Sequence, residues 1–324
     1  MKKRLKRICS MMLLAALLLG TLPVVAPVET FAYTEGDISG TTGTGTANDP
    51  VICNSFAELK AVLEWNNGSS LFYVRLINLP GGSEVLPDVE REDHWDVAPA
   101  ITAVGTKVLT VEGTPTFIMK GWNAYNEPDY SSLIQVDGSL HVNGSGTLTL
   151  EFHGSVIHES TVFDLNKSTG WLQFDQAATI RGTVWKDPDD KYTNPICMSV
   201  RANAGKLEIS GGNFEGQVWD TSYFAISGYR GAVMLSGSVK ATITDGTFRG
   251  DPVIQAENMF VCGLTTELDD SGWLKLRGGI FFGIADRDEK PLSRFLASYS
   301  ADDYASGHKM VLFDDQTISI LDPS

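Results

Sequence analysis

Apolar and polar positions alternate in short segments that recur along most of the chain. The clearest copies are ten-residue phrases in which an alternating apolar segment is followed by a Gly-Gly or Asp-Gly pair, an aromatic residue and a final Gly. They occupy 207–216, 241–250 and 274–283. Period-two alternation bounded by glycine predicts short strands and turns. Recurrence at intervals of 33 or 34 residues indicates a solenoid, in which each repeat buries its apolar face against its neighbours.

Six closing glycines mark the repeat, and an apolar residue stands two positions before each of them. The glycines are Gly121, Gly154, Gly182, Gly216, Gly250 and Gly283. The apolar residues are Met119, Phe152, Ile180, Phe214, Phe248 and Phe281. Stacked coils bring equivalent residues into columns, so we expect these apolar residues to form one interior stack. We expect each glycine to lie where the chain bends out of a strand.

Two or three short strands per repeat predict an all-β fold. The expected architecture is a right-handed parallel β-helix solenoid of about seven coils, with short capping helices at both ends. At the N-terminal end, Ser55 and Glu58 form a capping box ahead of a helical apolar face. At the other end, Pro291 suits the start of a second short helix. A last partial coil is expected at 310–313 and 318–321.

The phrase Gly-Gly-x-Phe-x-Gly and the helix-then-strand opening resemble the secreted pectate-lyase-like β-helix proteins of Gram-positive bacteria. The resemblance covers roughly residues 51–324 and implies the fold. It implies little about activity, because one fold hosts many sites. The Gly-His-Gly and Arg-x-Lys phrases of polygalacturonases are absent from residues 33–324. No calcium-binding acid cluster beside a basic residue, as in pectate lyases, can be identified from the sequence either.

The first residues of the chain differ from the rest. Five basic residues precede an apolar run over 11–19, which predicts a secretory signal peptide over residues 1–32, cleaved after Ala32. An uncleaved membrane anchor is the alternative, because the whole apolar stretch approaches spanning length. After cleavage we expect a flexible Gly/Thr-rich leader over 33–50, one β-helix domain over 51–324 and no membrane span. Within the domain, the N-terminal cap with the first strand, the repeated coils and the C-terminal cap are expected at 51–97, 98–290 and 291–324.

The charge of the chain restricts its partners. The whole sequence carries a net charge of −15, and removal of the first 32 residues leaves 20 basic against 39 acidic residues, a net charge of −19. Such a surface repels nucleic acid and anionic lipid. It also disfavours an acidic polysaccharide, unless a local basic patch or bound calcium intervenes.

The cysteines do not predict disulfides or a metal site. Cys53, Cys197 and Cys262 remain after cleavage, and an odd number excludes complete pairing. Cys197 and Cys262 fall two coils apart, roughly 9.6 Å at the strand spacing, whereas a disulfide needs Cα atoms within about 7 Å. We expect all three to be buried small apolar residues.

No cofactor is predicted, and calcium is the one metal considered. Asp187, Asp189 and Asp190 concentrate carboxylates in one turn, and calcium takes several oxygens from such turns. Their spacing matches no calcium-loop motif, and Asp-Pro-Asp is also ordinary turn chemistry.

Aromatic residues gather in the segments that follow the closing glycines. Trp185 and Trp219 each stand three residues after such a glycine, so stacking should make them vertical neighbours, with Tyr192 and Tyr223 nearby. If they face outward, they form a platform for sugar rings. Alternatively, the tryptophans fill the core or pack beneath loops.

The residues just before the closing glycines form another expected column, which should face solvent. They are Lys120, His153, Arg181, Glu215, Arg249 and Phe282. Arg181 and Arg249 could contact a polyanion from this strip. Alternatively, its charges alternate and offset one another.

Two classes of function remain. The first is a secreted or cell-surface, non-catalytic module that binds a glycan or a protein partner through its lateral face, released or held at the cell wall. The second is a polysaccharide lyase or glycoside hydrolase of the β-helix type with a degenerate site. The missing catalytic phrases favour the first class.

Overall fold

The chain folds as a parallel β-solenoid, which confirms the predicted class. The computed structural model describes residues 41–87, 98–122, 127–128, 131–153, 159–185, 196–218, 230–252, 261–282, 284–286, 309–314 and 317–321. These residues contain 23 strands and one helix. The solenoid has about five turns, slightly fewer than the seven expected. Strands become short at both ends of the stack, as in β1 (Val51–Cys53) and β21 (Ile284–Asp286), which have three residues each.

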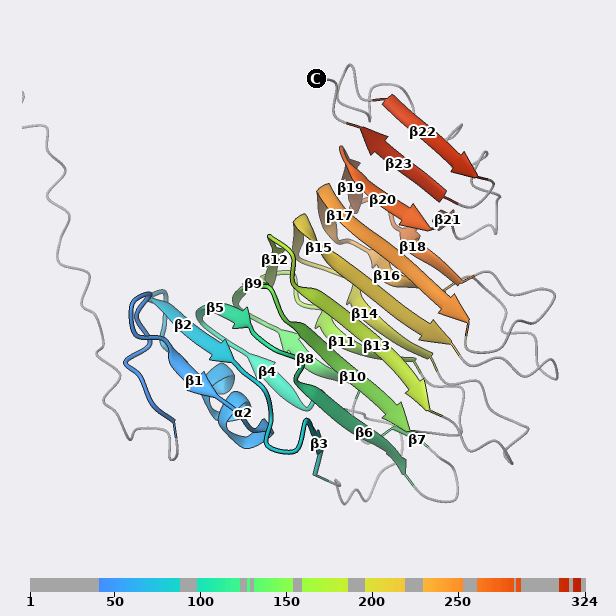
Figure 1. Cartoon of the computed structure of the whole chain (residues 1–324). Helices are drawn as coiled ribbons and strands as arrows, with labels where there is room; N and C mark the ends of the chain where they lie inside the picture. Colours follow the sequence, from blue (N-terminus) through green and yellow to red (C-terminus); the bar gives the residue numbers. More distant parts are fainter. Residues whose placement is uncertain are drawn as a thin grey trace, which may run out of the picture. The chain divides into compact units, whose positions relative to one another are not determined.

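The strands stack in three parallel columns, which run side by side along the solenoid (Figure 1). Column 1 contains β1, β2 (Leu71–Leu76), β5 (Thr106–Val111), β9 (Ser139–Gly144), β12 (Trp171–Phe174), the start of β15 (Lys206–Val218), the start of β17 (Lys240–Pro252) and β19 (Trp273–Leu276). Column 2 contains β3 (Ser83–Val85), β6 (Thr116–Trp122), β10 (Thr147–His153), β13 (Thr179–Trp185), the ends of β15 and β17, and β20 (Gly279–Phe282). Column 3 contains β4 (Ile101–Ala103), β8 (Ser132–Val136), β11 (Glu159–Leu165), β14 (Ile196–Ala202), β16 (Arg230–Gly237), β18 (Val261–Leu268) and β21. The short β7 (Glu127–Pro128) pairs antiparallel with the end of β6.

The six apolar residues of the repeat are interior, as expected. Each is at most 1 % exposed. The rings of Phe214, Phe248 and Phe281 stack face to face, with centroids 5.1 and 4.5 Å apart. The six residues belong to two ladders rather than one, because Phe152 pairs with Val184, whereas Ile180 pairs with Leu148, four positions away. The interval between the second and third closing glycines is 28 residues instead of 33 or 34, so equivalent positions of the repeat phrase are not register partners there.

Among the described residues, the closing glycines lie inside strands rather than at bends, which corrects the expectation; Gly154 and Gly283 lie outside the described residues. Gly182 and Gly216 lie inside β13 and β15. Gly182 continues a ladder that holds Leu150 in the preceding turn. A Cβ atom on Gly182 would lie 2.5 Å from the backbone oxygen of Cys197 in column 3. Glycine is therefore required there because columns 2 and 3 approach closely. The chain bends instead at glycines such as Gly246, whose φ is +121°.

The N-terminal end of the solenoid is closed by the predicted helix, α2 (Phe56–Glu64). The Ser55 hydroxyl accepts a hydrogen bond from the backbone N–H of Glu58 at 3.3 Å. The Glu58 carboxylate accepts from Asn54 N–H at 2.8 Å, one residue earlier than in a standard capping box. The apolar face of the helix is buried, as predicted.

A buried lysine joins this helix to column 1. Lys107 is 1 % exposed. Its ammonium donates to the backbone oxygens of Trp65 at 2.7 Å and Val104 at 2.5 Å, and to the Asn67 side chain at 3.1 Å. Burial lowers the pKa of Lys107 to about 8, because the apolar surroundings disfavour its charged form.

The predicted last coil forms an antiparallel hairpin, so that expectation is wrong in strand direction. The hairpin consists of β22 (Lys309–Asp314) and β23 (Thr317–Leu321), and β23 pairs antiparallel with β20 (Figure 1). The expected second helix, beginning at Pro291, lies outside the described residues.

Candidate functional site

The first predicted ligand face can be followed only in part. Trp185 ends β13 and is 52 % exposed, so it does not fill the core. Its ring stacks on that of His153, with centroids 5.0 Å apart. The other members of that face, and with them the pairing of Trp185 with Trp219, lie outside the described residues. They are Asp187, Asp189, Asp190, Tyr192, Trp219 and Tyr223.

The predicted basic strip separates into two ladders. One contains Lys120, His153 and Trp185. The other places Glu215 between Arg181 and Arg249. Arg181 Nε lies 2.5 Å from Glu215 Oε2. In the second ladder the structure therefore supports the alternative of offsetting charges.

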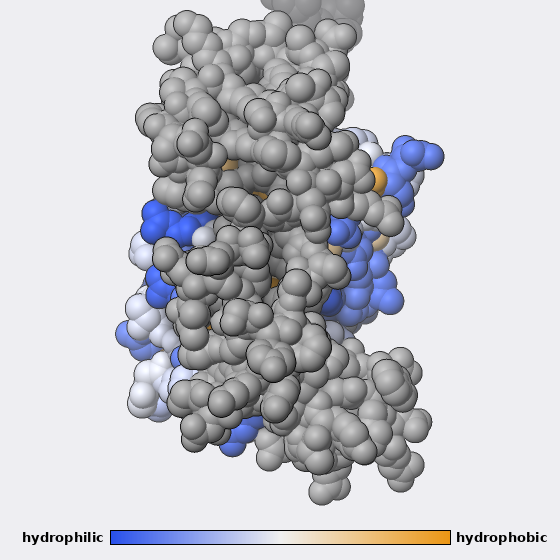
Figure 2. Space-filling model, turned by 90° about the vertical axis from the view of Figure 1, so that its right-hand side faces the viewer, coloured by the Kyte–Doolittle hydropathy of each residue, from blue (hydrophilic) through white to orange (hydrophobic). Residues whose placement is uncertain are grey.

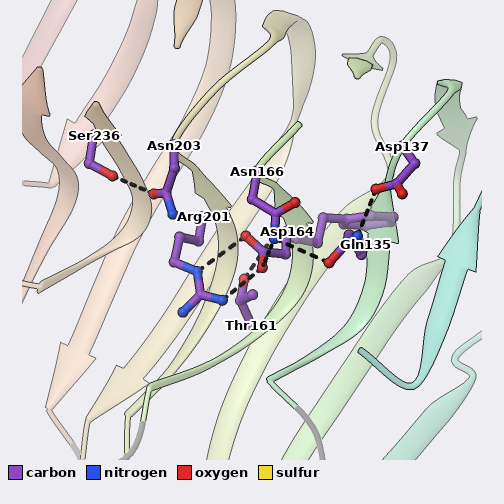
Figure 3. A network of polar contacts seen from close by, with 9 residues as sticks. Gln135, Asp137, Thr161, Asp164, Asn166, Arg201, Asn203 and Ser236 are labelled. Carbon is purple, nitrogen blue, oxygen red and sulfur yellow. Dashed lines mark hydrogen bonds and ion pairs between the residues drawn. The ribbon is translucent and has the colours of Figure 1, made fainter. Parts of the chain in front are cut away.

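The outer face of column 3 carries a polar network (Figure 3). Its members are Gln135, Asp137, Asp164, Asn166, Arg201, Asn203 and Ser236. The Asp164 side chain is only 2 % exposed and receives two hydrogen bonds from the Arg201 guanidinium, at 2.7 and 3.2 Å. A buried carboxylate held by a bidentate arginine is satisfied within the protein. We therefore interpret this network as structural support for the stack rather than as a ligand site.

The outer face of column 1 carries a different arrangement, which we call the Trp–Lys ladder. Trp171, Lys206, Lys240 and Trp273 pair directly in four successive turns, so two lysines lie between two tryptophans. Both lysines are exposed, and both tryptophans are half-buried. The ladder places aromatic faces and ammonium groups in one row along the solenoid.

Each tryptophan of the ladder is fixed by a neighbouring lysine. The Lys206 Nζ lies 4.2 Å from the centroid of the Trp171 ring, and Lys275 Nζ lies 4.7 Å from that of Trp273. A cation over an aromatic face is attracted by the negative face of the ring. These contacts hold the rings in place on an exposed sheet.

A surface groove of about 360 Å³ follows the ladder, and we call it the lysine groove. Lys206, Lys240 and Trp273 form one wall. The other wall consists of small residues from the turns between columns 3 and 1. These are Ser168, Gly205, Ser238 and Ser271. No carboxylate lines the lysine groove among the described residues, whereas serine hydroxyls do.

A second groove of about 290 Å³ lies on the same face, and we call it the hydroxyl groove. Its polar lining residues are His141, Gln173, Asp175, Glu208, Ser210, Thr242 and Thr244. His141 Nε2 lies 2.8 Å from an Asp175 carboxylate oxygen. Acceptors and hydroxyls at this density suit a ligand that is itself rich in hydroxyl groups.

Glu208 lies next to both grooves and is already engaged. It accepts from Trp171 Nε1 at 2.9 Å and Gln173 Nε2 at 3.0 Å, and it pairs with Lys206 at 2.9 Å. Burial by itself would raise the pKa of Glu208, but the hydrogen bonds from Lys206 and Trp171 outweigh it and lower that pKa below its ordinary value. Glu208 is therefore ionised at neutral pH and positions Trp171.

The sequence contained a signal for the Trp–Lys ladder that was not used. Trp171, Lys206, Lys240 and Trp273 each immediately precede an apolar-x-apolar triplet, at intervals of 35, 34 and 33 residues. The position before the strand is as periodic as the closing glycine.

Metal and thiol chemistry find little support in the described part of the chain. There, no group of three or more His, Cys, Asp or Glu side chains could hold a metal ion. Cys53 and Cys197 are buried, as predicted, and burial raises the pKa of both thiols. The side chain of Cys262 is outside the described set.

The described surface shows little apolar area for docking. Four large apolar side chains are exposed, on four different strands: Leu71, Val85, Trp185 and Ile280. In Figure 2 the described surface visible on both flanks is mainly hydrophilic. Within the described ranges, no helix is long and apolar enough to span a bilayer.

Comparison with protein-family models, with curated proteins and with solved structures finds no match to this chain. The resemblance to pectate-lyase-like proteins therefore rests on the repeat phrase and the opening of the domain. The strand pairings and the buried ladders establish the coarser conclusion, that the chain is a parallel β-solenoid.

Proposed function

We propose that this protein is a secreted, non-catalytic β-solenoid module that binds a glycan through the outer face of column 1. The observation that carries the proposal is the Trp–Lys ladder beside the lysine groove. The sequence of residues 1–32 supports export. The repeat phrase supports kinship with the secreted pectate-lyase-like proteins of Gram-positive bacteria.

The chemistry of the face suits sugars. The C–H face of a sugar ring is apolar and packs on an aromatic face, and its hydroxyl groups need both donors and acceptors at the rim. Trp273 supplies an aromatic surface in the lysine groove. The hydroxyl groove adds threonine and serine hydroxyls and the carboxylates of Asp175 and Glu208. The lining residues of each groove come from several successive turns, which suits a chain rather than a single ring.

A protein partner is less well supported by the same surface. Protein interfaces have a fully buried core enriched in aromatic and apolar residues and depleted of charge. The exposed large apolar residues of the described surface lie on separate strands, and the face with the grooves is charged and hydroxylated.

The test uses the full exported chain and a panel of immobilised polysaccharides. Trp273→Ala should lower affinity by about tenfold or more, the loss expected when an aromatic contact worth about 1.4 kcal/mol is removed. Trp185→Ala is the matched control, because Trp185 is exposed but lies on column 2. Equal binding by wild type and Trp273→Ala would refute the proposed face. A loss confined to Trp185→Ala would assign binding to the segments after the closing glycines.

The non-catalytic part of the proposal has its own measurement. Bound polysaccharides are assayed for new reducing ends and for unsaturated products over long incubations, and we expect neither. His141 and Asp175 form the histidine–carboxylate pair in the hydroxyl groove, so His141→Asn is the informative variant. Turnover that this variant abolishes would move the protein to the class of polysaccharide lyases or hydrolases.

A further inference from the structure

We infer that the lysine groove selects an anionic glycan, whose acidic groups bind at Lys206 and Lys240. The inference rests on the proposed function and specifies its ligand class. The shared chemistry is a carboxylate or sulfate group carried repeatedly along a sugar chain, with the chain lying along the Trp–Lys ladder.

The first argument is the direct pairing of two like charges. Lys206 and Lys240 are register partners in neighbouring strands of column 1. Like charges directly opposite each other destabilise a sheet. Two unit charges at the strand spacing of about 4.8 Å repel by about 1 kcal/mol even in water. Folding alone therefore gives no reason for this pair.

The second argument is the contrast with other charged ladders of the same solenoid. In column 2, Glu215 lies between Arg181 and Arg249. In column 3, Asp164 pairs directly with Arg201. These ladders alternate in sign and offset their own charge. The Trp–Lys ladder does not, so its counter-charge must come from outside the ladder.

The third argument concerns the acids close to the lysine groove. Lys206 is partly neutralised by Glu208, at 2.9 Å. Among the described residues, no carboxylate pairs with Lys240. Asp269, beside the groove residue Ser271, accepts from the Ser271 hydroxyl and from two backbone N–H groups, at 2.7 to 3.1 Å. That carboxylate is engaged within its own turn and leaves Lys240 available for a ligand.

The geometry defines how the ligand lies. Three rungs separate Trp171 from Trp273, roughly 14 Å at the usual strand spacing. The two ammonium groups occupy the middle of that length. Sugar rings stack near the ends, at Trp273 above all, and the acidic groups between them contact Lys206 and Lys240. On a protein of net charge −15, this local basic patch is what allows an acidic chain to approach.

The experiment compares hyaluronan, which carries carboxylates, with carboxyl-reduced hyaluronan, which keeps the same backbone without charge. Chondroitin sulfate distinguishes sulfate from carboxylate as the preferred group. We expect wild-type protein to bind at least one of the two acidic chains, with an affinity that falls as salt increases. We expect the reduced chain to bind at least about fivefold more weakly than the acidic chain. This factor is equivalent to about 1 kcal/mol, the contribution of one exposed ion pair.

The variants assign the charge dependence to named side chains. Lys206→Gln and Lys240→Gln should each weaken acidic-chain binding by about fivefold and weaken binding of the reduced chain by less. Lys120→Gln is the matched control, because it removes one exposed lysine from column 2. Equal binding of native and reduced hyaluronan, or equal losses in all three variants, would overturn the inference. If wild type binds neither acidic chain, the inference also fails. If a neutral glycan binds wild type and this binding is lost in Trp273→Ala, the proposed function remains supported although the inference fails.

Discussion

Replacing Gly182 by alanine tests the close approach of columns 2 and 3. In an ordinary strand this change stabilises a protein by about 0.5–1 kcal/mol, because glycine has more conformational freedom to lose on folding. Here the added Cβ would lie 2.5 and 2.6 Å from the backbone O and C of Cys197, and 2.8 Å from the backbone O of Met198. Backbone atoms cannot rotate away as a flexible side chain can. Overpacking of this kind typically costs about 1–3 kcal/mol, so we expect a net loss of about 1–2 kcal/mol.

The assay is urea unfolding of the full chain, followed by far-ultraviolet circular dichroism and tryptophan fluorescence. Coincident transitions in the two signals would justify a two-state free energy. Lys120→Gln serves as the control, since an exposed substitution should change stability by no more than about 0.5 kcal/mol. If Gly182→Ala is as stable as wild type, or more stable, the columns are not in close contact there.

Three further predictions concern the core, the buried lysine and export. Phe248→Ala should cost about 3–5 kcal/mol in urea unfolding, because the ring is fully buried between two stacked rings; a loss below about 1 kcal/mol would contradict an interior position. The pKa of Lys107 is lowered to about 8, so between that pH and its ordinary value of 10.5 the unfolded chain holds a proton that the folded chain has released. Stability should therefore rise with pH across this window, and Lys107→Met should flatten the rise measured by thermal unfolding; an unchanged slope would argue against a depressed pKa. N-terminal sequencing of exported protein should begin at Tyr33, whereas an intact Met1 in the membrane fraction would support the anchor.

The fold could be predicted because its main determinants are local and repeated. An interior aromatic every 33 or 34 residues, as at Phe214, Phe248 and Phe281, is visible without knowing which strands pair. The helix cap at Ser55 depends on a contact three residues away. The predicted register is wrong at Ile180, because the connection between turns varies in length and shifts the ladder by four positions, so that Ile180 pairs with Leu148. Period-two alternation cannot detect a shift by an even number of residues, since the side chain still points inward.

The candidate site was harder to predict for a related reason. Every outward position of a half-buried strand tends to be polar, whether or not it binds anything. Trp171, Lys206, Lys240 and Trp273 acquire meaning only when their register is known, because isolated exposed lysines and tryptophans are common. Sequence reasoning chose the face with the most aromatic segments, whereas the pairings identify the face on which the charges fail to alternate.

The antiparallel pairings at the two ends of the solenoid have a consequence for solubility. Uncovered strands at the end of a parallel solenoid can pair with the first strands of another copy. Head-to-tail growth would then produce a fibre. At the first end, the backbone N–H of Ile52 in β1 donates to Thr42 at 2.9 Å in an antiparallel bridge. At the last end, β23 reverses the chain direction on β20. Growth would require all three columns to continue together, so one reversed strand at each end is enough to prevent it. The stacking that builds the molecule is thereby confined to a single chain.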